Sequence, residues 1–169
     1  MQPAKTLALA LAALALSGGS AALASTIQLS DDRRGDARCE SKPCPDLKSA
    51  IANPGIFNKN ELFYIITQHN AVKLSSLPRI AINTSGPNTS APEFYVEKRA
   101  TGAGVFNVKT GRKSGPATWR NYNAKSANWT FLPSAIGNPS SYGWRVEVVQ
   151  AGSKVDATPN AGYLKRSLR

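Results

Sequence analysis

The hydrophobic pattern of this chain changes at about residue 61. Before that point the sequence is polar and rich in turn-forming residues. Beyond it, short runs of β-branched and aromatic residues are separated by Gly, Pro, Asn and Ser, as strands are separated by turns. Seven such runs predict strands, at residues 62–66, 79–83, 94–97, 105–109, 117–122, 129–132 and 144–148. The pattern predicts an all-β fold, either an antiparallel β-sandwich or a small barrel of about seven strands.

The polar segment before the strands contains one helix candidate, at residues 45–52. Leu47 and Ile51 are four positions apart and would share one face of a helix. Asp46 is placed to cap the first turn, and Pro54 would stop the helix. We therefore expect a helix of about two turns ahead of the β domain.

The first 24 residues have the pattern of a secretory signal peptide. A positive charge at Lys5 precedes an apolar run at residues 7–16, and small residues end at Ala24. This run is about half of the ~20 residues that cross a bilayer, so we expect cleavage and export rather than anchoring. The short leader, rich in Ala and Leu, is typical of bacterial proteins, and we expect a periplasmic or extracellular location.

The mature chain is predicted to have three parts. Residues 25–60 form the polar N-terminal segment, residues 61–150 the β domain, and residues 151–169 a basic tail or an edge strand. Its length suits one domain, since single domains usually contain about 100–200 residues. No later run is apolar enough to cross a membrane, so no transmembrane segment is expected in the mature chain.

Cys39 and Cys44 are the only cysteines of the chain. In an oxidising compartment two cysteines with no other partner are expected to form a disulfide. A loop this small gains about 2 kcal/mol from closure, enough to fix a local turn. The neighbouring Arg34-Gly35-Asp36 has the sequence of an adhesion tripeptide, but its charged, turn-like surroundings provide no context for that role.

The positive charge of the mature chain lies entirely in its second part. After removal of the leader, 20 Lys and Arg stand against 10 Asp and Glu. Residues 25–61 contain six of each sign, whereas residues 62–169 contain 14 bases and four acids. A field of this sign attracts polyanions. The expected partner is therefore anionic: an anionic polymer, an anionic envelope component or an acidic protein.

Metal, cofactor and catalytic motifs are not evident in the sequence. Zinc sites draw on several closely spaced Cys and His, and this chain has two cysteines and one histidine, His69. The nucleophile, metalloprotease and phosphate-loop motifs are missing. We therefore expect no metal and no cofactor, and binding rather than catalysis.

The favoured functional prediction is an exported, non-enzymatic binding module. Its partner would be an envelope glycan or lipid head group, a nucleic acid or an acidic protein surface. Basic and aromatic side chains interleaved on a β surface can hold anionic groups and stack on rings. The candidate binding residues are Lys98, Arg99, Lys109, Arg112, Lys113, Trp119, Arg120 and Tyr122.

The alternative prediction is a secreted, metal-independent ribonuclease or another small hydrolase. His69 would act as the base, assisted by Glu97 or Glu93, and Arg99 would stabilise the transition state. The residue types suit that chemistry, but their spacing in the sequence does not bring them together.

Overall fold

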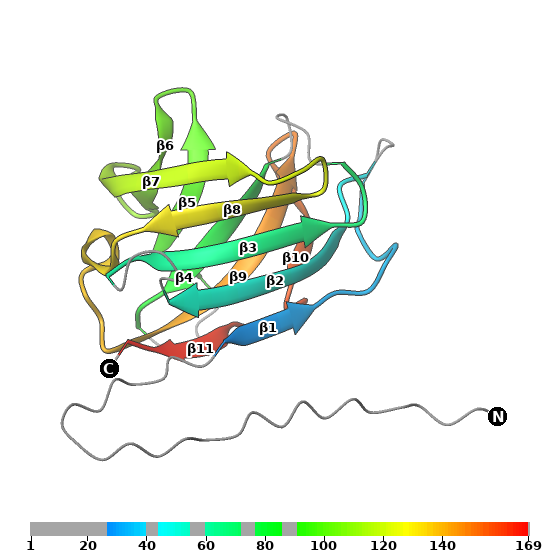
Figure 1. The fold of residues 1–169 in the computed structure, drawn as a ribbon. Coiled ribbons are helices and arrows are strands. Elements are labelled where there is room, and N and C mark those ends of the chain that lie inside the picture. The colour runs from blue at the N-terminus through cyan, green and yellow to red at the C-terminus, as the bar shows by residue number, and fades with distance from the viewer. Residues whose placement is uncertain (1–26, 40–43, 55–59, 72–76, 86–90, 169) are drawn as a thin grey trace, which may run out of the picture.

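The chain folds as an all-β protein, and its computed structural model describes residues 27–39, 44–54, 60–71, 77–85 and 91–168 (Figure 1). A single turn of 3-10 helix, η2, covers Pro133–Ile136. The strands are β1 (Gln28–Asp31), β2 (Leu47–Pro54), β3 (Leu62–Gln68), β4 (Pro78–Asn83), β5 (Phe94–Arg99), β6 (Gly102–Asn107), β7 (Lys113–Asn121), β8 (Ser126–Phe131), β9 (Ser141–Gln150), β10 (Ser153–Thr158) and β11 (Leu164–Ser167).

These eleven strands form one antiparallel sheet that curls into a nearly closed barrel. The order is β1-β2-β3-β8-β7-β6-β5-β4-β9-β10, and β11 also pairs with β9. The long strand β7 joins the two halves, because its first residues pair with β6 and its later residues with β8. The two edges meet through side chains: Ser30 Oγ lies 2.7 Å from Thr158 Oγ1, and Gln28 Nε2 donates to the Lys165 carbonyl. Figure 1 shows β11 next to β1 at this edge.

The core lies between the two halves of the barrel and is built around buried aromatic rings. Trp129, Trp144 and Tyr64 are fully buried. The Trp129 indole donates to the Pro78 carbonyl at 2.9 Å, which satisfies its polar atom. The Tyr64 and Tyr142 hydroxyls lie 2.5 Å apart, and burial raises the pKa of Tyr142 to about 12. Because large rings bury much apolar area, we expect the packing of these aromatic side chains to contribute strongly to core stability.

Each of the seven predicted strands overlaps an observed strand, but the predicted number was too small. The prediction missed β1, β2 and β10, and only anticipated β11 as a possible edge strand. β1 and β11 are four residues long, too short for an alternating pattern to stand out. β10 reads SKVDAT, which has few apolar residues, although Val155 and Ala157 are buried. It is a strand because it pairs with β9.

The predicted helix at residues 45–52 is wrong, because this segment forms strand β2. β2 pairs with β1 on one side and with β3 on the other, so both edges of its backbone are hydrogen-bonded. A register shift between Leu47 and Ser49 leaves Leu47, Ala50 and Ala52 facing the core. Because of this register shift, the buried positions do not follow the two-residue period of a regular strand. Leu47 and Ile51 are four positions apart, which is also a helical spacing.

The disulfide prediction is confirmed: Cys39 and Cys44 are bonded, with their Cα atoms 5.6 Å apart. The predicted signal peptide lies outside the described residues. No helix among the described residues is long and apolar enough to cross a membrane.

Candidate functional site

Five charged side chains form a row across β5, β4 and β9, which we call the arginine ladder: Arg99, Glu97, Arg79, Glu147 and Arg145. The backbone register explains the row. Ile80 pairs with Val96 and Val146, and all three face the core. Their neighbours therefore point to the outer face of the sheet, where Arg79 sits between the two glutamates.

Positive and negative side chains alternate along the ladder, and each glutamate lies close to two arginines. Arg79 Nη2 lies 2.8 Å from Glu147 Oε2, and Arg79 Nη1 lies 3.6 Å from Glu97 Oε2. At the ends of the row, Arg99 Nε is 2.7 Å from Glu97 Oε1 and Arg145 Nη2 is 2.5 Å from Glu147 Oε1. Glu147 is only 1% exposed, so its charge is neutralised almost out of contact with water. Three arginines against two glutamates leave the row with one positive charge.

Each arginine of the ladder also lies over an aromatic ring. Arg79 is 3.6 Å from the Tyr95 centroid. Arg99 lies over Phe106 and Arg145 over Tyr163, at 3.9 and 4.7 Å. Cation–π contacts of this kind fix the guanidinium planes flat against the sheet.

The ladder continues into the turn between β6 and β7. Arg99 Nη1 donates to the Gly111 carbonyl at 2.9 Å, and Lys113 Nζ reaches the Ala103 carbonyl at 2.8 Å. Gly104 permits that reach, since a Cβ there would lie 2.5 Å from Lys113 Cε. We call the combined surface the basic face; its cations are Arg79, Arg99, Arg145, Lys109, Arg112 and Lys113.

The predicted binding residues are thus only partly brought together. Arg99 and the Lys109–Lys113 turn share the basic face, whereas Lys98 alternates to the opposite side of β5. Trp119 packs against the core residue Trp129, with ring centroids 4.8 Å apart. Arg120 therefore points outward from the other half of the barrel, near the exposed ring of Tyr122.

The alternative catalytic residues lie in separate places. The His69 backbone N–H bonds to the Asp46 carbonyl at the start of β2, and its Nε2 has no partner among the described residues. Glu97 belongs to the ladder. Glu93 accepts from Thr84 and Ser85, which hold its pKa below the usual range although partial burial acts to raise it. The described contacts do not join the histidine side chain to either glutamate.

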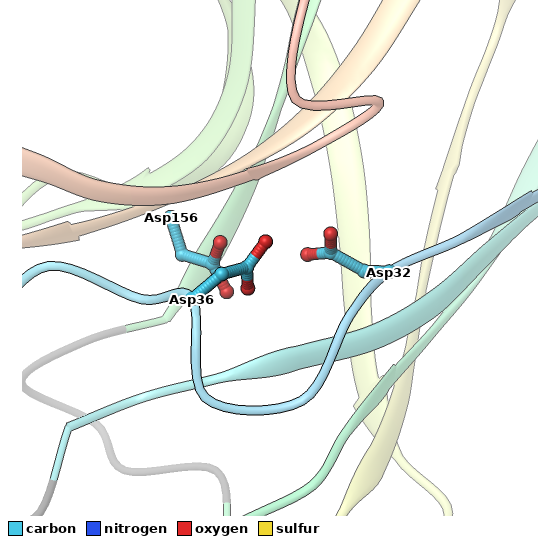
Figure 2. A group of neighbouring side chains, drawn as sticks. All are labelled: Asp32, Asp36 and Asp156. Atoms are coloured by element: carbon cyan, nitrogen blue, oxygen red, sulfur yellow. The ribbon is translucent and has the colours of Figure 1, made fainter.

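A second charged region, which sequence reasoning missed, is a group of converging carboxylates. Asp32 and Asp36 lie in the loop after β1, and Asp156 lies on β10; one carboxylate oxygen from each is within 4.8 Å of the others. Figure 2 shows the three carboxylates turned toward one another. Burial, and then the charges of Asp156 and Asp36, raise the pKa of Asp32 to about 7. We call this group, together with the adjoining Asp46, the acidic site.

The sequence held one signal for the acidic site: four aspartates, Asp31, Asp32, Asp36 and Asp46, within 16 positions. This signal is weak, because residues 25–61 contain as many bases as acids. Asp156 is more than 100 positions further along the chain, and it comes close only because β10 lies beside the start of β2, where its Oδ2 accepts from the Leu47 N–H at 2.6 Å.

Comparisons with family models, with curated protein sequences and with solved structures find no match to this chain. The fold and its two charged regions therefore define the class of protein: a nearly closed antiparallel β-barrel with an outer basic face and a separate acidic site.

Proposed function

We propose that this protein is an exported, non-enzymatic binding protein whose basic face docks an acidic polysaccharide. The ligand groups would be carboxylates, sulfates or phosphates along a glycan of the cell envelope or its surroundings. Guanidinium groups suit such ligands because their planar forks match the geometry of these anions.

The proposal rests on the pairing of the four acids in residues 62–169. All four are engaged within the fold: Glu97 and Glu147 by arginines, Glu93 by Thr84 and Ser85, and Asp156 by backbone N–H groups. The cations are far more accessible, and the exposed ones among the described residues are Lys98, Lys109, Arg112, Lys113, Arg120, Lys125, Lys154 and Lys165. The surface beyond residue 62 therefore presents positive charge with little competition.

The aromatic contacts favour a charge-reading face over one that stacks nucleobases. The rings of Tyr95, Phe106 and Tyr163 lie under arginines, so their faces are already occupied. Proteins that hold single-stranded nucleic acid generally offer free rings to successive bases. Pre-oriented arginines with covered rings suit an acidic glycan better.

Equilibrium binding to heparin, a model acidic polysaccharide, tests the proposal, with uncharged dextran as the reference ligand. The test variant is Lys109→Ser/Arg112→Ser/Lys113→Ser. Its control, Lys48→Ser/Lys154→Ser/Lys165→Ser, removes three exposed cations elsewhere, so the two variants have equal net charge. In ~100 mM salt we expect the turn variant to bind heparin about tenfold or more weakly, and the control to change by less than about threefold.

Three results would overturn the proposal. Wild-type affinity for heparin no greater than that of a neutral exported protein would remove the binding function itself. Equal losses in the two triple variants would show that binding follows net charge and not the basic face. Stronger binding to single-stranded DNA than to heparin at equal salt would replace the glycan with nucleic acid.

A further inference from the structure

The acidic site contains buried carboxylate oxygens that the fold leaves without partners. Asp32 Oδ2, Asp36 Oδ1 and Asp46 Oδ1 are all buried and accept no hydrogen bond from any described residue. Asp46 is a fourth acid outside the group of three, and the residue is only 6% exposed. A buried, unpaired carboxylate is costly, and a fold normally supplies a cation or several N–H groups for each one.

Asp46 is held at the same place as the other acids. Its Oδ2 accepts from the Gly35 N–H at 2.9 Å, next to Asp36, which leaves Oδ1 as the unpaired atom. Asp156 Oδ2 accepts from the N–H of Leu47, the residue that follows Asp46, at 2.6 Å, so the Asp156 carboxylate lies against the same stretch of backbone. Asp46 therefore places a nine-tenths buried, unsatisfied oxygen beside the three converging carboxylates.

No cation of the fold answers these charges in the described part of the chain. None of the salt bridges found between described residues involves these four acids; those of Arg79, Arg99 and Arg145 belong to the arginine ladder, on the outer face of β4, β5 and β9. The polar side chain that bridges the acids is Asn160, whose Nδ2 lies 3.1 Å from Asp32 Oδ1 and 2.9 Å from Asp36 Oδ2. A neutral amide occupies the position where a positive charge would satisfy both carboxylates.

We propose that the acidic site binds a calcium ion, with Asp32, Asp36 and Asp156 as ligands and Asp46 as a further ligand or close counter-charge. Carboxylate oxygens are the donors of hard divalent cations. Calcium–oxygen bonds of about 2.3–2.6 Å suit oxygens spread over the observed span, whereas magnesium requires a tighter octahedron at about 2.0–2.1 Å. A half-turn of the Asn160 amide would replace its NH₂ with its oxygen, adding a neutral ligand. This proposal is independent of glycan binding.

The disulfide fits this site. Asp36 lies three residues before Cys39, and Asp46 lies two residues after Cys44, so the bond ties together the segments that supply both acids. The Arg38 N–H bonds to the Val155 carbonyl at 2.7 Å, which fixes the same loop to β10 beside Asp156. The closed loop thus positions ligands from two parts of the sequence.

Calorimetric titration of the EDTA-treated, dialysed protein with CaCl₂ tests the site, together with thermal unfolding in CaCl₂ and in EDTA. We expect one site with half-saturation at about 10⁻⁴–10⁻³ M, as in extracellular calcium modules. Tenfold excess over that concentration should raise Tm by about 3–6 °C. Asp36→Asn should weaken binding at least tenfold, and the matched control Asp31→Asn, an exposed acid at the end of β1, should bind like wild type.

The variant also separates a binding role from a structural one. In EDTA, Asp36→Asn should unfold at the same or a higher temperature than wild type, because it removes a repelling charge. Asp32→Asn should behave in the same way and serves as a second variant. No calcium-dependent heat or Tm shift in wild type would overturn the proposal, as would an unchanged response in both asparagine variants. An equal or larger response to MgCl₂ would overturn the choice of calcium.

Discussion

The arginine ladder and the acidic site both bury carboxylates, but they treat the charge in opposite ways. In the ladder, Glu147 is contacted by two arginines and is almost fully buried. In the acidic site, Asp156 receives only backbone N–H groups, and its neighbours are other acids. The first region is satisfied by the fold itself, whereas no described cation pairs with the second, which a proton or a cation from solution would complete.

The difference explains how one chain can be basic overall and still contain an acidic site. The ladder uses its two glutamates internally, so the basic face presents positive charge to solvent. The acidic site draws three of its four acids from residues 25–61, where the charges cancel in number. The net charge of a sequence segment therefore does not predict either region. The sheet brings charged residues from different segments together and so determines which charges are paired.

The largest expected effect in this comparison comes from the central arginine of the ladder. Arg79→Met keeps much of the side-chain volume but removes the cation between Glu97 and Glu147 and the contact with Tyr95. Glu97 would keep only Arg99 and Glu147 only Arg145, and because Glu147 is almost fully buried we expect a loss of about 2–4 kcal/mol of unfolding free energy in urea. The control Lys98→Met, at an exposed cation of β5, should change it by less than about 0.5 kcal/mol. Equal effects would show that the ladder contributes little to stability.

A smaller loss of stability is expected from removing the disulfide. Of the two regions, only the acidic site should change its binding. The Cys39→Ser/Cys44→Ser variant should lose about 2 kcal/mol of unfolding free energy, the value for closing so short a loop. Calcium binding should weaken, because the loop positions Asp36 and Asp46, while heparin affinity should not change. Heparin affinity that falls with the disulfide would place the glycan site in this loop instead of on the basic face.

A third effect is a pH dependence of the acidic site. In the folded protein the pKa of Asp32 is about 7, above the value of 3.8 that an unperturbed Asp has. The folded state therefore binds this proton more tightly, which stabilises it below pH ~4, and the contribution is lost as pH rises through 7. In EDTA, the unfolding free energy of wild type relative to Asp32→Asn should fall between pH 4 and pH 8. A flat or rising difference would contradict the raised pKa.

The sequence was a good guide where a run of β-branched and aromatic residues is bounded by turn-forming residues. Seven strands were located in this way, and the disulfide followed from compartment and cysteine number. Short edge strands, and a strand with a register shift such as β2, were missed because their pairing partners, and not their own pattern, determine their structure. The correct fold class therefore came with a wrong helix and too few strands.

The candidate sites were harder to predict, because each is assembled across strands. The ladder joins Arg79, Glu97 and Glu147 from β4, β5 and β9, and only the sheet register places them in one row. Of these three, only Glu97 was singled out in the sequence, as a possible catalytic acid. Asp156 joins acids more than 100 positions earlier, a distance over which no local motif can be recognised.

The central claim is that buried carboxylates are paired with arginines in the ladder but lie beside other acids in the acidic site. It is tested most directly by making the same change, acid to amide, in each region. The unfolding free energies of Glu147→Gln and Asp32→Asn would be measured by urea denaturation in EDTA at pH 8, alongside wild type. We predict opposite signs: Glu147→Gln loses stability because it leaves Arg145 without a carboxylate and Arg79 with Glu97 alone, and Asp32→Asn gains stability because it removes a repelling charge. Destabilisation by both substitutions would contradict this account.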